Sequence, residues 1–290
     1  CEVAVGETVC SIALCTLTGT ADALTDPTCF GAADGSATIS AQGGIAPLTY
    51  SLDGGTPQSD PTFTGLSAGN YQVILNDANG CADTLQFGLN EPDTLTVSLQ
   101  ITATIDCHSG STGAIAATAN GGNGGYSYDW GDPGIGDTPT PDELTAGTYI
   151  LQVSDALGCT AIDTVTITQP DSIIIQLAPQ AASCAELEDG ALQSVVTGGV
   201  PPYDYSWSNT ATTPEIDGLQ AGNYCLTIND GNGCEQIACA EVTSPPALLI
   251  DSLTFTPPLC NGGDNGSASV FVSGGTGDYT YNWSDNLAQS

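Results

Sequence analysis

The sequence predicts an all-β protein made of small sandwiches in tandem, and three observations support this fold class. Several landmarks recur with one period of about 77 residues, which is the signature of a repeat architecture. Each period holds six or seven short strand-like segments and shows no helical periodicity. Gly (36) and Pro (17) are abundant while hydrophobic residues reach 40%, a profile too apolar for a disordered acidic tail.

Four landmarks share the period. Gly-Gly pairs start at positions that step by 78, 77 and 76 residues, and one series of cysteines steps by the same distances. A Leu-x-Ala-Gly-x-Tyr motif and a second cysteine series both step by 78 and 75. In this order, the landmarks begin at Gly43, Gly121, Gly198 and Gly274; Cys29, Cys107, Cys184 and Cys260; Leu66, Leu144 and Leu219; and Cys81, Cys159 and Cys234.

The second period shows the expected strand order. An alternating first strand is followed by a second, a Gly-Gly turn, an aromatic third strand, a variable Pro-rich segment and a closing hairpin. The matching turns at 76–80 and 229–233 carry the Asn-Gly signature of a tight β-turn. The segments are 95–105, 114–119, 126–130, 131–143, 148–154 and 161–168. This order predicts a Greek-key, immunoglobulin-like sandwich.

Two aromatic positions fit a sandwich core. Leu52, Trp130, Trp207 and Trp283 each lie nine residues after the start of a Gly-Gly pair, and we expect them to fill the core from the third strand. The tyrosine of Leu-x-Ala-Gly-x-Tyr should form a tyrosine corner by bonding to the upstream backbone. The alternative is an aromatic platform for sugars. Its residues would be Tyr203, Tyr205, Trp207, Tyr279, Tyr281 and Trp283.

Short junctions with one or two prolines separate the periods. They divide the chain into the tail of a preceding repeat (1–12), repeat 1 (13–91), repeat 2 (92–169), repeat 3 (170–244) and the first part of repeat 4 (245–290). Because such linkers are short and Pro-containing, neighbouring repeats should be closely coupled. The chain opens and closes in mid-pattern, so we expect a window on a longer repetitive polypeptide.

Twelve cysteines beside a single histidine indicate disulfides in an oxidising, extracellular setting and argue against zinc. We expect one bridge inside each repeat, because a strictly alternating strand order places the first turn and the last hairpin at one end. Such a loop would stabilise its repeat by about 4 kcal/mol on the chain-entropy model. The expected pairs are Cys29–Cys81, Cys107–Cys159, Cys184–Cys234, Cys225–Cys239 and Cys10–Cys15.

The charge balance excludes several partners. The chain has no Lys, no Arg and a formal net charge of −33, so nothing can neutralise a nucleic-acid backbone or an anionic membrane. Evenly spread acids and the lack of a distinctive catalytic pair indicate a protein that is not an enzyme. We expect no cofactor, although the acidic turns at Asp77 and Asp264 are candidates for Ca²⁺. Ordinary turn chemistry is the alternative for both turns.

The order of motifs in repeat 3 resembles one known family. Gly-Gly-x-x-Pro-Tyr-x-Tyr-x-Trp-Ser-Asn at 198–209 precedes the Leu-Gln-Ala-Gly-Asn-Tyr and Asn-Asp-Gly-Asn-Gly-Cys motifs, and a Pro-containing junction follows. This order resembles the SprB-type repeats of Bacteroidota surface adhesins. The resemblance implies a very long secreted protein, exported by the type IX system to the outer surface of a Gram-negative cell as a filament or stalk for adhesion, gliding motility or matrix. Its partners would be neighbouring repeats or protomers and surface polysaccharide.

Two alternatives stay open at this point. The chain could instead be a spacer or carbohydrate-binding array attached to a secreted enzyme. Five Asp-(Ser/Thr)-apolar triplets also resemble the O-glycosylation acceptor pattern of the same phylum, although strand alternation accounts for them nearly as well. The hydroxyl residues of these triplets are Thr84, Thr94, Thr164, Ser172 and Ser252.

Overall fold

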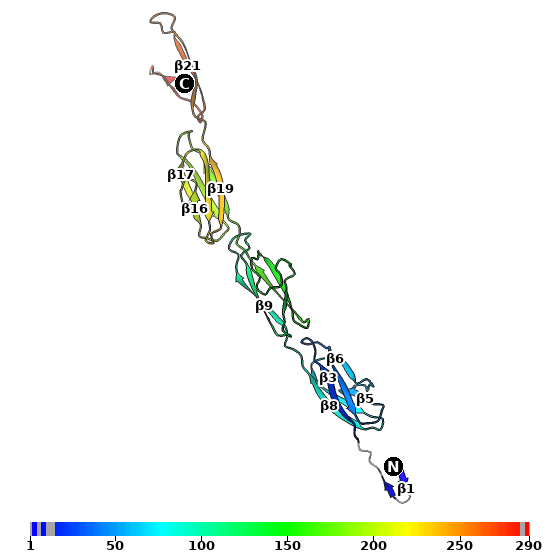
Figure 1. The fold of residues 1–290 in the computed structure, drawn as a ribbon. Coiled ribbons are helices and arrows are strands. Elements are labelled where there is room, and N and C mark those ends of the chain that lie inside the picture. Colours follow the sequence, from blue (N-terminus) through cyan, green and yellow to red (C-terminus); the bar gives the residue numbers. More distant parts are fainter. Residues whose placement is uncertain (1, 5–6, 10–14, 285–287, 290) are drawn as a thin grey trace. The chain divides into compact units, whose positions relative to one another are not determined.

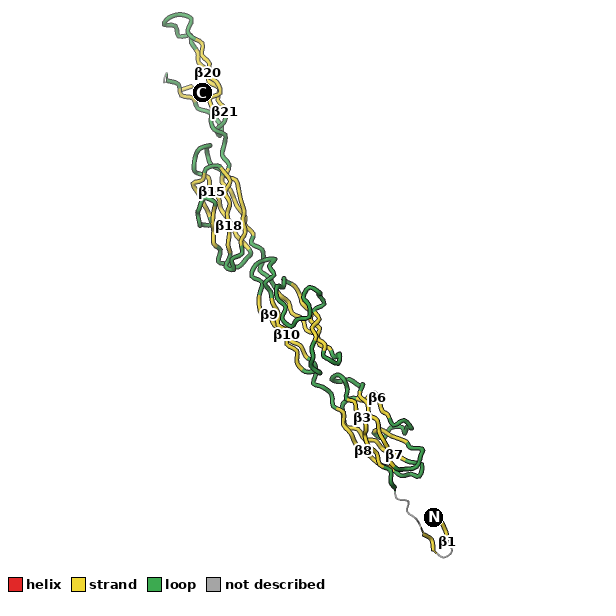
Figure 2. Tube along the Cα trace, in the orientation of Figure 1, coloured by secondary structure: helices red, strands yellow, loops and turns green. Residues whose placement is uncertain are grey.

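The structure, a computed structural model, describes residues 2–4, 7–9, 15–284 and 288–289. Figure 2 shows strands and loops only, and no helix among these residues could cross a membrane. The chain divides into two compact units, one made of Cys1–Ala103 with Gly113–Ile167 and the other of Thr104–Thr112 with Thr168–Ser290. The loop that carries Cys107 therefore belongs with repeat 3, although its flanking strands belong to the first unit.

Repeat 1 is a sandwich of two three-stranded antiparallel sheets in the first unit (Figure 1). One sheet has the order β3-β4-β6, and the other has the order β5-β7-β8. Alternate residues such as Ala37, Ile39, Val73 and Leu75 are buried between them, as the period-two strand pattern requires. The strands are β3 (Thr18–Thr25), β4 (Gly35–Gln42), β5 (Thr49–Leu52), β6 (Thr62–Leu66), β7 (Gly69–Asn76) and β8 (Ala82–Leu89).

Repeat 2 has the same plan with a reduced first sheet. β9 pairs with β10, and a bridge between Gly113 and Leu144 replaces the third strand of that sheet. The second sheet has the order β11-β12-β13. The strands are β9 (Thr96–Ala103), β10 (Ala114–Asn120), β11 (Ser127–Asp129), β12 (Gly147–Ser154) and β13 (Thr160–Ile167).

Repeat 3 lies in the second unit and repeats the plan of repeat 1. Its sheets have the orders β14-β15-β17 and β16-β18-β19, and they enclose Leu192, Leu226, Ile228 and Val242, all of which are fully buried. Each such side chain contributes about 1.5–3 kcal/mol of burial free energy. The strands are β14 (Ile174–Gln180), β15 (Gly190–Thr197), β16 (Asp204–Trp207), β17 (Glu215–Leu219), β18 (Gly222–Asn229) and β19 (Glu235–Val242).

The ends of the chain hold short two-stranded pieces. β1 (Glu2–Ala4) pairs with β2 (Glu7–Val9) before repeat 1. In repeat 4, β20 (Leu249–Thr256) pairs with β21 (Ser267–Ser273), and β22 (Tyr281–Asn282) pairs with β23 (Ala288–Gln289). The predicted fold class is therefore confirmed: the chain is an all-β array of immunoglobulin-like repeats with disulfides.

The recurrent Gly-Gly pair is explained by two close approaches. A Cβ on the first glycine would lie 2.1 Å from the Thr94 carbonyl oxygen at Gly121, and 2.0 Å from the Ser172 oxygen at Gly198. The second glycine, Gly122, has φ +59°, and a Cβ there would lie 2.6 Å from a carboxylate oxygen of Asp155. Only glycine tolerates both the positive φ and the contact.

The recurrent aromatic residues pack and bond inside their own repeats. Trp130 and Trp207 are buried, and their indole Nε1 atoms donate to the Thr138 and Thr213 carbonyls, each at 2.9 Å. The predicted tyrosine corners are confirmed, because the hydroxyls of three tyrosines donate to the carbonyl four residues upstream. These are Tyr71 to Ser67, Tyr149 to Thr145 and Tyr224 to Gln220.

Candidate functional site

The cysteines that carry the period bridge consecutive repeats. Cys29 of repeat 1 is bonded to Cys159 of repeat 2, and Cys107 of repeat 2 is bonded to Cys234 of repeat 3. We call Cys29, Cys107, Cys184 and Cys260 the first-turn cysteines, and Cys81, Cys159 and Cys234 the hairpin cysteines. A first-turn cysteine thus pairs with the hairpin cysteine of the next repeat.

The expected pairs Cys29–Cys81, Cys107–Cys159 and Cys184–Cys234 are therefore wrong. The reason is strand direction. β17 is antiparallel to β15, and the chain turns back from β15 into β16 through the short segment 198–203. Both β16 and β17 therefore run opposite to β15, and together they cross the sandwich once while changing from one sheet to the other. The strand order then has an odd number of traverses, which places the first turn and the last hairpin at opposite ends of a repeat.

The remaining cysteines differ in role. Cys225 and Cys239 lie directly opposite each other on β18 and β19 and are bonded. Cys15 pairs with Cys81, so it does not pair with Cys10, which lies outside the described residues. Cys184 and Cys260 are free and exposed, which contradicts the expected pairing of Cys184 with Cys234.

The turn that holds each first-turn cysteine has the same hydrogen bonds in all four repeats. The carbonyl of the cysteine accepts a hydrogen bond from the backbone N–H three residues later. The N–H of the residue just before the cysteine donates to a polar side chain five residues after the cysteine. The carbonyl bonds measure 3.0 Å at Cys29, 3.0 Å at Cys107, 3.3 Å at Cys184 and 2.9 Å at Cys260. The capping side chains are Asp34, Thr112, Asp189 and Asn265.

The hairpin that presents the partner cysteine is organised by one aspartate. An oxygen of Asp155 accepts from the N–H groups of Leu157 (3.0 Å) and Cys159 (2.9 Å), and its other oxygen accepts from the N–H of Asn123 (2.7 Å). One oxygen of Asp230 likewise accepts from the N–H groups of Asn232 and Cys234, and its other oxygen accepts from the N–H of Val200. Asp77 accepts in the same way from the N–H groups of Asn79, Cys81 and Ile45. The bonds of Asp230 and Asp77 measure 2.8–3.0 Å.

These bonds stabilise the ionised form of the aspartates. Burial alone would raise the pKa of Asp155, but the backbone and side-chain donors of Asn123 and the N–H groups of Cys159 and Leu157 outweigh it. The net result is a lowered pKa. For Asp230 and Asp77 burial likewise opposes ionisation, and their backbone N–H donors again lower the pKa.

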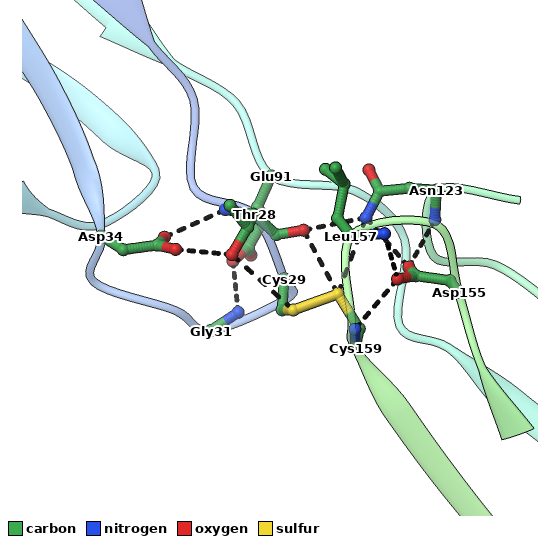
Figure 3. The surroundings of a disulfide bond; sticks show 9 residues. All are labelled: Thr28, Cys29, Gly31, Asp34, Glu91, Asn123, Asp155, Leu157 and Cys159. Carbon is green, nitrogen blue, oxygen red and sulfur yellow. Dashed lines mark hydrogen bonds between the residues drawn. A yellow bond between two sulfur atoms is a disulfide. The ribbon is translucent and has the colours of Figure 1, made fainter.

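An asparagine joins the two halves of each bridge. The Asn123 amide nitrogen donates to the Thr28 carbonyl at 2.8 Å, and the Cys159 Sγ lies 3.3 Å from that oxygen (Figure 3). At the other bridge the Asn232 amide donates to the Asp106 carbonyl at 2.9 Å, with the Cys234 Sγ also at 3.3 Å. The carbonyl before each first-turn cysteine therefore accepts the amide hydrogen bond and lies against the sulfur of the bridge.

Side chains just before the junction prolines hold the same turns. Glu91 accepts from the Gly31 N–H at 2.6 Å, and Gln169 accepts from the Ser109 N–H at 2.9 Å. Sequence reasoning identified Glu91-Pro92 and Gln169-Pro170 as linkers but did not assign these contacts. Their signal was present, because both acceptors occupy the position before the junction proline.

The other candidate residues have ordinary surroundings. The candidate glycosylation residues Thr84, Thr94, Thr164, Ser172 and Ser252 are all exposed. The aspartates Asp83 and Asp163 of two triplets accept from the Gly19 and Leu99 N–H groups of the facing sheet. Both oxygens of Asp77 are used by N–H donors, and Asp264 is exposed. Among the described residues no group of three His, Cys, Asp or Glu side chains could hold a metal.

The comparison with protein families decides the kind of repeat. Residues 21–57, 179–212 and 252–288 match the family model of the SprB repeat. The chain carries SprB repeats. Each matched segment contains a first-turn cysteine and a Gly-Gly pair. SprB repeats occur in cell-surface proteins, so this chain is a repeat region of a cell-surface, adhesin-like protein.

Solved structures with similar chains include three multidomain proteins. The 282-residue C-terminal fragment of intimin, in complex with the intimin-binding domain of its translocated receptor, is 14% identical with a TM-score of 0.33, covering 54% of this chain and 67% of that one. The three N-terminal domains of the bacteriophage RB49 outer capsid protein Hoc are 16% identical with a TM-score of 0.33, and the match covers 76% of this chain and 96% of that one. The N-terminal eight Ig domains of DSCAM are 11% identical with a TM-score of 0.32, and the match covers 89% of this chain and 40% of that one. No curated protein matches the chain.

Proposed function

We propose that this chain is a structural segment of an extracellular filament or stalk that resists extension through disulfides between consecutive SprB repeats. The observation that carries the proposal is the pairing of Cys29 with Cys159 and of Cys107 with Cys234. Such a segment would hold an adhesive or gliding apparatus away from the outer surface of a Gram-negative cell after type IX export. Its partners would be neighbouring repeats or protomers and surface polysaccharide.

The pairing creates a short covalent route through the array. From Cys81 the backbone reaches Cys107 after 26 residues, and the disulfide then leads directly to Cys234. Most of those 26 residues belong to β8 and β9, which are already extended. The backbone route from Cys81 to Cys234 takes 153 residues. At about 3.4 Å per extended residue, the two routes limit extension to about 90 Å and about 520 Å.

A second covalent route has the same form. It enters at Cys29, crosses to Cys159, and follows β13 and β14 to Cys184. The segments between a first-turn cysteine and its own hairpin cysteine, 29–81 and 107–159, lie on neither route. Tension would therefore pass along extended strands and disulfides, and unfolding of the intervening strands would add almost no length.

Composition suits such a surface polymer. With a net charge of −33 and no basic residue, neighbouring chains repel one another and remain soluble. Glycans on the exposed hydroxyls of Thr84, Thr94, Thr164, Ser172 and Ser252 would hydrate that surface. The repeated all-β scaffold fits a structural role, which we assign to it in place of an enzymatic one.

Single-molecule stretching of the whole chain, tethered at its ends, tests the proposal. In reductant the total length gained on unfolding should exceed the gain of the oxidised chain by at least about 430 Å, because the Cys107–Cys234 loop alone hides 127 residues. A Cys225→Ser, Cys239→Ser variant under oxidising conditions is the control, since that loop spans only 14 residues. Equal gains for the oxidised and reduced chains would refute the proposal.

A further inference from the structure

The turn around Cys184 already has the arrangement that its bonded counterparts have. Its carbonyl accepts from Leu187 N–H, and Asp189 accepts from both the N–H and the hydroxyl of Ser183. Thr28 and Asp34 make the same two contacts beside the bonded Cys29. Cys184 nevertheless is free and exposed. The turn is therefore formed without a partner.

An open apolar hollow of about 610 Å³ lies beside this thiol. Cys184 lines it together with residues of repeat 4, including Leu248, Ile250, Val272 and Trp283. The residues at the equivalent positions of repeat 3 are Ile173, Ile175, Val196 and Trp207, and they belong to the core completed by β18 and β19. The hollow is thus the place that a β18–β19 hairpin fills one repeat earlier.

The fourth repeat leaves this face uncovered in the part of the chain that the structure describes. Leu248 is 61% exposed and Ile250 is 72% exposed. The Leu-x-Ala-Gly-x-Tyr motif that begins the covering hairpin occurs only three times in residues 1–290. Exposed apolar side chains gathered on one face mark a surface that another polypeptide segment can cover.

We infer that Cys184 and this hollow together bind a β-hairpin with an Asp-x-x-Gly-Cys turn, of the kind that β18 and β19 form in repeat 3, and that the hairpin cysteine bonds to Cys184. The hairpin lays its apolar side chains on β20 and β21. Its turn then presents the cysteine to the preformed Cys184 loop, as Cys159 meets Cys29. The inference rests on the proposed function and continues the covalent route that ends at Cys184.

The bond can form by thiol–disulfide exchange, which needs no net oxidation. The Cys184 thiol loses its proton to solvent and its sulfur attacks the hairpin cysteine of a mixed disulfide. The old S–S bond breaks, the small thiol leaves as a thiolate, and the new S–S bond forms. Starting from two free thiols, the two electrons would go to a disulfide-donating thiol oxidoreductase.

A peptide of residues 222–242 is the probe, with Cys225–Cys239 closed to hold the hairpin and Cys234 activated as a mixed disulfide with thionitrobenzoate. It is added to the full chain, and mass spectrometry locates the adduct. Cys260 is the matched control, because its thiol is also exposed and its turn has the same hydrogen bond, but it does not line this hollow. Rates are divided by those of a small symmetrical disulfide at each thiol.

The expected result is at least tenfold faster reaction at Cys184 than at Cys260. A peptide with Asp230→Asn and Asn232→Ala should lose most of this preference, since its turn and its amide contact are removed. Equal rates at the two thiols, a preference for Cys260 or no adduct would overturn the inference. Those outcomes would leave the stretching result untouched, because Cys29–Cys159 and Cys107–Cys234 do not involve Cys184.

Discussion

The amide nitrogen of Asn123 lies 2.8 Å from the carbonyl oxygen of Thr28, which belongs to the preceding repeat. Asn232 makes the equivalent contact to Asp106 at 2.9 Å. The two asparagines come from different segments: Asn123 follows a Gly-Gly pair, whereas Asn232 lies inside the hairpin turn. Two sequence positions thus supply one donor at one place, which indicates that the contact itself is required.

Removing this donor should weaken one bridge at a time. In Asn123→Ala, the Cys29–Cys159 disulfide should be reduced about five- to tenfold more readily, because a neutral hydrogen bond of about 1 kcal/mol no longer holds its halves together. The Cys107–Cys234 bond should be unchanged. Asn232→Ala should show the reverse pattern. Peptide mapping after graded reduction measures both bonds, and identical behaviour of the two variants would contradict the assignment.

The pairing itself is open to direct measurement. Digestion of the oxidised chain should release peptides that join Cys29 to Cys159 and Cys107 to Cys234. Trypsin is useless because the chain has no Lys or Arg, so an acid-specific protease is required. Peptides joining Cys29 to Cys81 or Cys107 to Cys159 would show instead that each bridge stays inside its repeat.

The sequence was sufficient for the fold class, because a period-two pattern and a fixed spacing of Gly-Gly pairs are local signals. It was also sufficient for the tyrosine corners, whose bonds reach only four residues. The partners of Cys29 and Cys107 could not be obtained in this way, since they depend on which end of a sandwich each turn occupies. The chain passes from one sheet to the other between β16 and β17, and because the sequence does not reveal this crossing, the predicted end of the sandwich for the last hairpin is reversed. The role of Asn123 was missed because it acts across a junction, and that of Glu91 because its partner Gly31 lies 60 residues away in the sequence.

Two glycines in the turn that follows β10, Gly121 and Gly124, should separate the cost of an unfavourable backbone conformation from the cost of a steric clash. Gly124→Ala keeps a residue at φ +69° with nothing within 4 Å of the new Cβ, and it should cost about 1 kcal/mol of unfolding free energy. Gly121→Ala places its Cβ 2.1 Å from the Thr94 oxygen and should cost about 3 kcal/mol or more. Denaturant titration measures both values, and equal costs would argue against the clash.

The lowered pKa of Asp155 predicts a particular dependence on pH. A carboxyl whose pKa is lower in the folded state contributes stability above the ordinary aspartate pKa of about 3.9, and loses it as the pH falls through the folded value. The melting temperature of Asp155→Asn should therefore lie several degrees below that of the unaltered chain at pH 6, and the difference should shrink as the pH falls below the ordinary aspartate pKa. Asp142→Asn removes the same charge from an exposed side chain. A difference for Asp155→Asn that stays constant with pH would exclude the carboxylate as the cause.

The surplus of 33 carboxylates should make stability depend on ionic strength more than on any particular cation. Raising NaCl from 10 to about 150 mM shortens the Debye length from about 30 to 8 Å and screens the mutual repulsion, so the melting temperature should rise. Because the oxygens of Asp77 are already bonded to N–H donors, Ca²⁺ and Mg²⁺ at equal ionic strength should raise the melting temperature equally. A larger shift with Ca²⁺ that Asp264→Asn abolishes would instead establish a calcium site in the turn of repeat 4.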